Sequence, residues 1–370
     1  MRVSVVTSAH RFDDPRVFGR EAVTLVEAGH EVRLFAPGAP NETISGVVLS
    51  GPSMPMNRLS RMTTTAFRLS RQGVKNADVV HIHDPELLLL LFLLSFRRKR
   101  PQLIYDAHED YAAQLLEKPW IPRPLRRPIS RLLGRAERTV ARRCDLVVAA
   151  TPSIARQFEG CELAIVQNMP RHDLLPAARV RAAGPTFCCL HVGELNERRG
   201  ANALIHASIA LAEEGVVFEQ IGPIKPNELA RRVAEKFEIR TRMTHTDLLD
   251  RLVFADAGLV LFQPGPNHDE SQPNKLFEYL ALGLPILASD FPHWRRLAES
   301  CDALIEFVDP TDEAAVVEGL KRLRKKALNH DRIGQAERSR RRFNWSREAE
   351  VLVAAYAQVA ERVEVSAARD

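Results

Sequence analysis

The chain has 370 residues, more than one hydrophobic core usually organises, so we expect two domains of ordinary size. A composition of 45% hydrophobic and 27% charged residues excludes a disordered chain, a collagen-like repeat and a coiled coil. The 52 Lys and Arg against 47 Asp and Glu give a net charge of +5, which favours anionic partners but is too small to indicate nucleic acid.

The cysteines and the apolar runs indicate a cellular compartment. None of the five cysteines forms a CxxC pair, so neither a disulfide framework nor a zinc site is predicted. The chain turns polar after Thr7, too early for a signal peptide, and the run from Leu87 to Phe96 is about half the ~20 residues of a membrane-spanning helix. We therefore expect a cytoplasmic protein with a buried helix over that run.

Short β-rich runs alternate with helical patterns along the chain, which is typical of βαβ units in a parallel sheet. The helix predicted over 15–28 has Asp14 as its N-cap, Pro15 at its first position and Gly29 just beyond its end. A second series of strands starts at Phe187. Strands are predicted over residues 3–7, 31–36, 79–83, 103–106, 145–150 and 166–169, then from 187 and over 216–221, 258–262, 285–289 and 303–308.

These patterns predict two doubly wound α/β domains, residues 1–170 and 185–345, joined by a polar linker over 171–184. A final helix within 346–370 returns to the first domain. Such sheets bind ligands at the carboxyl ends of their strands. Neither half has GxGxxG after its first strand and no Walker-type phosphate loop is present, which disfavours a nicotinamide or flavin enzyme and a nucleoside triphosphatase.

The most informative segment is ESQPNKLFEYLALGLPILASD, residues 270–290. Its polar loop leads into a helix that opens near Asn274, and backbone N–H groups in the first turn of a helix suit a diphosphate. Lys275 adds a cation, while Glu270 and Glu278 frame the segment and could accept hydrogen bonds from sugar hydroxyls. Taken alone, two glutamates at this spacing could equally be ordinary loop and helix-surface carboxylates.

Loops after the strands of the first domain carry histidines and charged residues, where an acceptor hydroxyl would be oriented. Alternatively, His83 and Asp84 form only the entry to a helix at Pro85, and His108 satisfies a buried hydrogen-bonding group. The residues that we expect on the acceptor side are His10, Arg16, His83, Asp84 and His108.

A basic stripe follows, formed by Arg127, Arg131, Arg135, Arg138 and Arg142 at helical spacing. A basic amphipathic helix can lie on an anionic membrane surface. The alternative is an ordinary surface helix whose apolar face is buried. The apolar residues that lie largely away from the stripe are Leu125, Ile129, Leu132, Ala136 and Val140.

The segment ESQPNKLFEYLALGLPI closely resembles the Glu-x7-Glu motif of retaining nucleotide-sugar glycosyltransferases of the GT-B fold, family 4 in particular. HRFDDPRVFGREAVTLVEAGHEV, HIHDPELL, YDAHEDY, ERTVARRCDLVVAAT and HVGELNERRG are similar to their counterparts, in the same order, in a bacterial branch of that family. The resemblance covers nearly the whole chain. It implies two Rossmann-like domains that face each other across a cleft.

The resemblance also implies roles for the matching residues. Glu278 would hold the ribose hydroxyls of the donor, Glu270 would lie near the donor sugar, and Arg199 would contact the diphosphate. His108 matches the family's loop histidine near the donor sugar. One position departs from the pattern, because Glu194 follows Gly193 where many members have arginine. Either Arg198 or Lys275 could restore the missing cation.

We therefore expect a retaining, metal-independent, hexosyltransferase-type enzyme without a cofactor. It would move a sugar from a nucleotide-diphosphate sugar to a hydroxyl of a sugar or lipid-linked acceptor, in cell-surface polysaccharide or glycolipid synthesis. The alternatives are a nucleotide-sugar epimerase or hydrolase of the same architecture and a catalytically silent relative that binds sugar nucleotides. Peripheral attachment to the inner face of the cell membrane is a further expectation, and no nucleic acid partner is expected.

Overall fold

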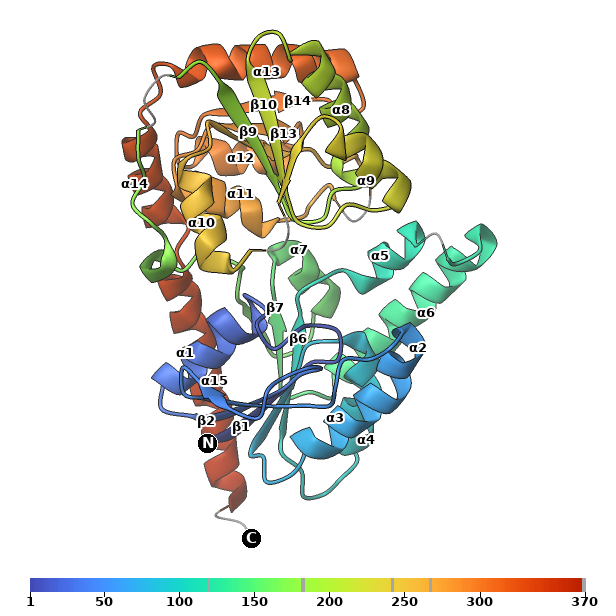
Figure 1. The fold of residues 1–370 in the computed structure, drawn as a ribbon. Helices are drawn as coiled ribbons and strands as arrows, with labels where there is room; N and C mark the ends of the chain where they lie inside the picture. The colour runs from blue at the N-terminus through green and yellow to red at the C-terminus, as the bar shows by residue number, and fades with distance from the viewer. Residues whose placement is uncertain (119, 181–183, 241–242, 266–267, 368–370) are drawn as a thin grey trace. The chain divides into compact units, whose positions relative to one another are not determined.

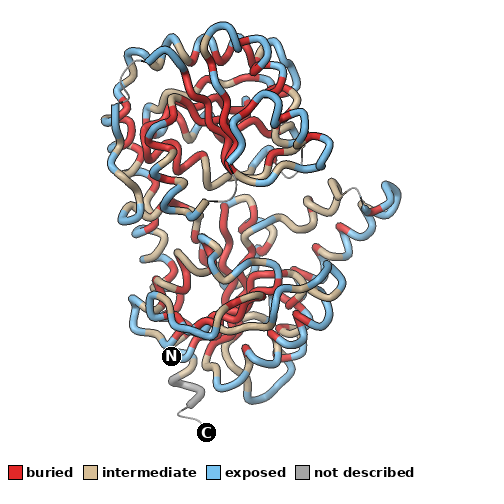
Figure 2. Tube along the Cα trace, in the orientation of Figure 1, coloured by how far each residue is buried: buried red, intermediate tan, exposed pale blue. Residues whose placement is uncertain are grey.

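The computed structural model describes residues 1–118, 120–180, 184–240, 243–265 and 268–367. They divide into two compact units, Met1–Asn168 with Trp345–Asp370, and Met169–Asn344 (Figure 1). In each unit the buried residues concentrate along the strands, with exposed residues on the surrounding helices and loops (Figure 2). Of the linker expected over 171–184, residues 181–183 lie outside the described part of the chain.

The first unit has an eight-stranded sheet in the order β3-β4-β2-β1-β5-β6-β7-β8. The pairings are parallel apart from the antiparallel pair β3–β4, and Val3 lies between Val32 and Val79 in register. The strands are β1 (Arg2–Val6), β2 (Glu31–Phe35), β3 (Thr43–Ile44), β4 (Val47–Ser50), β5 (Val79–Ile82), β6 (Gln102–Ala107), β7 (Leu146–Ala149) and β8 (Leu163–Ile165).

Helices cover both faces of this sheet, which explains why its central strands are continuous apolar runs. One face packs against η1 (Val17–Ala22), α1 (Val23–Glu27) and α15 (Trp345–Ala367), so the final helix belongs to the first unit. The other face packs against α3 (Ala66–Gly73), α4 (Leu88–Leu94), α6 (Arg123–Ala141) and α7 (Pro152–Ala155). The connecting helices are α2 (Arg58–Ser60), η2 (Arg61–Thr65), η3 (Pro85–Leu87), α5 (Tyr111–Glu117) and η4 (Arg156–Phe158).

Local signals of the first unit are largely confirmed. Asp14 Oδ1 accepts the N–H groups of Arg16 (2.8 Å) and Val17 (3.0 Å), but the N-cap is Arg16 rather than Asp14, so the helix starts two residues later than predicted. Gly29, with a φ of +84°, lies just beyond its end as predicted. The helix begins as a π-helical segment at Val17. The strand predicted over 166–169 is wrong, because β8 ends at Ile165. Val166 is apolar because it packs in the core of the first unit, not because it belongs to a strand.

The apolar run that was expected to form a buried helix buries only one face. Leu88, Leu91 and Leu94 of α4 are buried, whereas Leu89, Leu93 and Phe96 are 58–65% exposed. Among the described residues, none of the helices combines the length and the hydropathy that crossing a bilayer demands.

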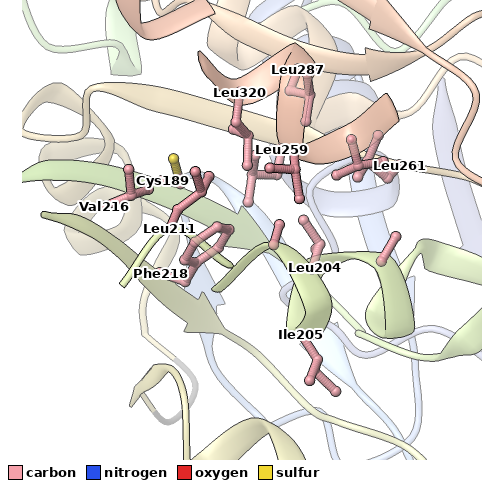
Figure 3. Close-up of a cluster of buried hydrophobic side chains, with 14 of the residues drawn as sticks. Cys189, Leu204, Ile205, Leu211, Val216, Phe218, Leu259, Leu261, Leu287 and Leu320 are labelled. Carbon is pink, nitrogen blue, oxygen red and sulfur yellow. The ribbon is translucent and has the colours of Figure 1, made fainter. Parts of the chain in front are cut away.

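The second unit has a six-stranded parallel sheet in the order β11-β10-β9-β12-β13-β14. α8 (Ala201–Ala210), α9 (Asn227–Ala234) and α13 (Glu313–Ala327) cover one face, whose core includes Leu204, Phe218 and Leu259 (Figure 3). α10 (His245–Val253), α11 (Asn274–Ala281) and α12 (Pro292–Glu299) cover the other. The strands are β9 (Phe187–Val192), β10 (Val216–Ile221), β11 (Glu238–Arg240), β12 (Ala257–Val260), β13 (Ile286–Ser289) and β14 (Ile305–Val308); η5 (His172–Leu174), η6 (Glu197–Arg199) and α14 (Arg332–Arg342) complete the unit.

Candidate active site

In the connection between β9 and α8, the backbone passes very close to the residues that follow β12. Gly193 follows β9 with a φ of +92°, and Gly200 has a φ of +78°. A Cβ on Gly200 would lie 2.6 Å from Leu261 Cβ and 2.8 Å from the Leu261 carbonyl oxygen. Only glycine therefore fits where this loop meets the end of β12.

Two cations gather at this loop. The Arg199 guanidinium carbon lies 5.7 Å from the centre of the Phe262 ring, and Lys275 Nζ lies 5.4 Å from it. Arg199 Nη1 donates to the Glu194 carbonyl oxygen (3.0 Å), and a Cβ on Gly193 would lie 4.0 Å from Lys275 Nζ. The structure thus brings together Arg199, Lys275 and Gly193, which lie far apart in the sequence.

The partly buried Lys275 is held by a histidine that the sequence analysis missed. Lys275 Nζ donates to Nε2 of buried His191 (3.1 Å), while the other ring nitrogen, Nδ1, donates to Gln220 Oε1 (2.7 Å). Burial and then the charge of Arg199 hold the pKa of Lys275 well below its ordinary value, against the opposing effect of Glu278. An anion at this position would relieve both effects.

Glu194, the residue that departs from the family pattern, has its own cation. Lys225 Nζ lies 2.7 Å from Glu194 Oε2, and Asn196 Nδ2 donates to Oε1 (2.9 Å). Burial opposes the charge of this carboxylate, but the hydrogen bonds from Lys225 and Asn196 lower its pKa. Lys225 therefore offsets the negative charge of Glu194.

The two glutamates have different surroundings. Glu278 is buried on α11, and its Oε1 lies 3.0 Å from Nε2 of His245, the first residue of α10. Glu270 is exposed in the loop before α11, and the Trp294 indole fixes that loop by donating to the Ser271 carbonyl oxygen (2.8 Å). α11 begins at Asn274, as predicted. Arg198 has an exposed side chain, and its carbonyl oxygen accepts the N–H of Gln263 (2.8 Å).

In the first unit, Asp84 organises the loop after β1. It is fully buried, and its Oδ2 accepts hydrogen bonds from Thr7 Oγ1 (2.7 Å) and from the N–H groups of Ser8 (2.6 Å) and Ala9 (3.1 Å). Such multiple bonds to one carboxylate lock the loop at the end of the strand. The side chain expected to meet an acceptor instead shapes the backbone beneath it.

Arg16 is likewise interior. Its Nη2 lies 2.9 Å from both Glu21 Oε1 and Asp106 Oδ2, and its Nη1 donates to the Val166 carbonyl and to Asn168 Oδ1 (2.8 Å each). Burial and the nearby Asp106 raise the pKa of Glu21, whereas Arg16 holds the pKa of Asp106 low against its burial. Of the two carboxylates beside Arg16, Glu21 is therefore the one that binds a proton more readily.

Two buried histidines complete this network. His81 and His83 stack at 4.5 Å, and Glu21, His81, His83 and Asp106 each offer a ligand atom within 4.8 Å of one another. A metal ion bound by these four groups would compete with the Arg16 guanidinium for the same carboxylate oxygens. His83 was expected beside an acceptor, but it lies fully buried beneath the sheet edge.

His10 and His108 form the part of this edge that is only partly buried. Their Nε2 atoms are 2.9 Å apart, His108 Nδ1 lies 3.2 Å from Asp106 Oδ1, and His10 Nδ1 lies 3.3 Å from Asp14 Oδ2. Burial opposes a charge on His10, but Asp14 and Asp84 outweigh it and raise its pKa to about 9. A protonated His10 donates to His108, which in turn donates to Asp106, so both rings have fixed orientations.

Two family models match the chain. Residues 16–164 match the model described as Glycosyltransferase Family 4, and residues 186–326 match the one described as Glycosyl transferases group 1. The first unit is thus similar to family 4 and the second to group 1 of the glycosyltransferases, and the fold is that of GT-B enzymes. No curated protein matches the chain.

Solved structures share the fold across both units. The sucrose-phosphate synthase of Thermosynechococcus elongatus has a TM-score of 0.75 at 15% identity, covering 98% of this chain and 100% of that one. The UDP-forming α,α-trehalose-phosphate synthase of Burkholderia xenovorans, in complex with glucose-6-phosphate, has a TM-score of 0.63 at 15% identity and coverages of 98% and 100%. Anabaena HepE, in complex with UDP and glucose, has a TM-score of 0.63 at 14% identity and coverages of 99% and 100%. At these identities the likeness establishes the fold.

Proposed function

We propose that the protein transfers a sugar from a nucleotide-diphosphate sugar to an acceptor hydroxyl with retention of configuration and without a metal or cofactor. The observation that carries the proposal is the pair of cations, Arg199 and Lys275, that both lie within 6 Å of the centre of the Phe262 ring, beside the Gly193 loop. Lys275 is also the second residue of α11, whose first turn offers unpaired N–H groups to the same anion. In this proposal Lys275 supplies the positive charge that is missing at position 194, where many family members have an arginine.

These groups would act on the leaving group. Negative charge accumulates on a nucleoside diphosphate as its bond to the anomeric carbon breaks, and fixed cations stabilise that transition state more than the ground state. Asn274 would present its backbone N–H group, and Arg198 would reach the outer phosphate. Gly193, whose own N–H donates to the Ile221 carbonyl oxygen (2.8 Å), would let the diphosphate approach the backbone closely. Because the cations neutralise the diphosphate, the step needs no divalent metal.

The carboxylates and histidines would orient the sugars. Buried Glu278, held by His245, is suited to accept both ribose hydroxyls, and exposed Glu270 is suited to the donor sugar. His108 would face the donor sugar and His10 the acceptor. Arg16, His83 and Asp84 would support them from the interior. The reaction fits cell-surface polysaccharide or glycolipid synthesis in the cytoplasm, with a sugar or lipid-linked acceptor.

Product analysis tests the proposal. The protein is incubated with UDP-, GDP-, ADP- or TDP-sugars, with and without acceptor, after a thermal-shift panel has selected the nucleotide. We expect transfer in the presence of EDTA, with the donor's anomeric configuration in the product by NMR. Glu278→Ala should reduce turnover strongly without unfolding the protein. Donor isomerised or hydrolysed equally well without acceptor would favour the epimerase or hydrolase, and nucleotide binding without turnover would favour the silent relative.

We also propose that α6 attaches the enzyme to an anionic membrane surface. The alternative, an ordinary surface helix with a buried apolar face, fits the end of α6, where Val140 is buried in the core, but Leu125, Ile129 and Leu132 are 39–68% exposed. Before Val140, the buried residues of α6 are small or polar, and Ser130 Oγ donates to the Ala112 carbonyl of α5 (2.7 Å). Exposed leucines beside an arginine stripe match the apolar and anionic layers of a lipid headgroup region.

Liposome sedimentation tests this attachment. Leu132→Ser should weaken binding to phosphatidylglycerol vesicles at low salt, whereas Leu328→Ser, which changes an equally exposed leucine of the second unit, should not. Failure of the unchanged protein to bind such vesicles would exclude the attachment.

A further inference from the structure

A cavity of about 250 Å³ lies in the first unit beside the loop that follows β1. The β1 loop forms one wall and the segment that contains α2 and the start of η2 forms the other. Its volume is below the ~300–1,000 Å³ of pockets that enclose whole ligands, so it suits one chemical group of a larger molecule. The lining residues are Ser8, Ala9, His10, Arg11, Pro37, Met54, Pro55, Asn57, Arg58 and Arg61.

The charge of this cavity has one sign. Four lining residues, His10, Arg11, Arg58 and Arg61, are basic, and none of the lining residues is acidic. Two arginines have carboxylate partners outside the lining, since Arg11 Nε lies 2.9 Å from Asp13 and Arg61 Nη2 lies 2.5 Å from Glu86. Concave sites of one sign concentrate ligands of the opposite sign.

Two arginines of the second wall are arranged to receive an anion. Arg61 Nε is buried and has no hydrogen-bond partner among the described residues. A buried guanidinium N–H without an acceptor is costly, so an oxygen-bearing ligand would satisfy it. The Arg58 guanidinium carbon lies 4.6 Å from the centre of the Trp120 ring, and this stacking leaves the N–H groups in the guanidinium plane available to an oxyanion.

The cavity also connects with the histidine pair. His10 lines it and lies 2.9 Å from His108 through the Nε2 atoms. An anionic group bound between Arg58, Arg61 and His10 would hold the rest of its molecule at the edge of the sheet that carries His108. The cavity would then fix the acceptor by a group remote from the reacting hydroxyl.

We propose that this cavity binds the phosphate of a phosphate ester, so that the acceptor of the reaction is an anionic molecule. Only the identification of the bound molecule as the acceptor rests on the proposed sugar transfer, because phosphate binding itself can be measured without turnover. The phosphate could belong to a soluble sugar phosphate or to a lipid, and Met56 (93% exposed) and Leu59 (72% exposed) stand beside the lining arginines where a lipid would pass.

Calorimetric titration with glucose 6-phosphate, inorganic phosphate and glucose tests the soluble form. We expect the two phosphates to bind and glucose not to bind. Arg58→Gln and Arg61→Gln should each weaken phosphate binding about tenfold or more, as the loss of a charge-assisted hydrogen bond implies. Arg68→Gln is the matched control, because it removes an exposed arginine of α3 that does not line the cavity and should leave binding unchanged. Arg58, being exposed, can be replaced without disturbing the fold.

Vesicles of phosphatidylcholine with phosphatidic acid, compared with phosphatidylcholine alone, test the lipid form. Binding to phosphatidic acid that falls in Arg58→Gln and Arg61→Gln but not in Arg68→Gln would assign the phosphate to a lipid. The proposal is overturned if the binding of phosphate and of phosphatidic acid vesicles is unchanged in both Arg58→Gln and Arg61→Gln. It is also overturned if Lys275→Met, at the donor site, abolishes phosphate binding while the arginine variants retain it. Titration with nucleoside diphosphates reports separately on the donor site, so the two proposals can fail independently.

Discussion

Lys275 provides a direct test of the donor site through protons. Burial and Arg199 hold its pKa well below 10.5, and a diphosphate would raise it again by supplying the negative charge that Lys275 lacks. Between the free and the bound pKa of Lys275, binding therefore takes up as much as one proton. Over that window the affinity for a nucleoside diphosphate should fall up to about tenfold for each unit of rising pH, or ~1.4 kcal/mol.

Titration calorimetry in buffers of different ionisation enthalpy measures this uptake. The observed binding enthalpy should vary linearly with the ionisation enthalpy of the buffer, with a slope between zero and one proton. Lys275→Met should abolish the slope and weaken binding by ~1.5–3 kcal/mol, the value of a hydrogen bond to a charged group. Lys225→Met, which alters the exposed lysine beside Glu194, should keep the slope. A binding enthalpy independent of buffer in the unchanged protein, with Lys275→Met binding equally well, would refute the assignment of Lys275 to the diphosphate.

Three further outcomes concern the framework of the two sites. Gly200→Ala should lower the free energy of unfolding by more than Gly160→Ala, because both glycines have positive φ (+78° and +84°) but only Gly200 would also overlap Leu261; urea unfolding measures the difference, ~1–3 kcal/mol. His10→Gln should remove a stabilisation of about 3 kcal/mol at most, complete below the unfolded pKa of 6.5 and lost as the pH rises through about 9; urea unfolding at pH 6 and 9.5 measures it. Tyr356→Phe should cost ~1–3 kcal/mol in thermal unfolding, because it leaves His81 Nδ1, 2.8 Å from the phenol oxygen, buried without a donor.

Each of these has an outcome that contradicts it. Equal losses at Gly200 and Gly160 would show that the approach to Leu261 carries no cost. A constant difference between His10→Gln and the unchanged protein at the two pH values would mean that His10 is not held protonated by Asp14 and Asp84. A Tyr356→Phe variant as stable as the unchanged protein would mean that His81 finds another partner.

The alternation of apolar and polar runs was enough to predict two parallel sheets and the loops that carry the chemistry. The start of α11 at Asn274 and the end of the first helix before Gly29 could also be predicted, because both depend on residues within a few positions of one another. The strand at Leu163–Ile165 was displaced in the prediction because Val166, which follows it, is more buried than the strand residues themselves. An apolar residue indicates that a position is buried, but it does not by itself indicate that the position lies in a strand.

Pairings across long sequence distances could not be predicted. Lys275 meets His191 84 positions away, and Glu278 meets His245 33 positions away. The pattern placed His83 and Asp84 at a strand end, but which way a side chain points there depends on partners such as Thr7 and Asp106. On α6 the helical period was read as burying the largest apolar side chains, whereas close packing against α5 selects Ser130 and Gly134.

The membership of α15 in the first unit has a consequence for synthesis of the chain. A ribosome releases residues 169–344 before it completes Trp345–Ala367, so the second unit can fold while the first still lacks a helix. Until then the groove that will receive Trp345, Leu352 and Tyr356 is open, with the His81 imidazole at its base. The first unit thus starts to emerge before the second but matures after it, and a chaperone could bind it during that interval.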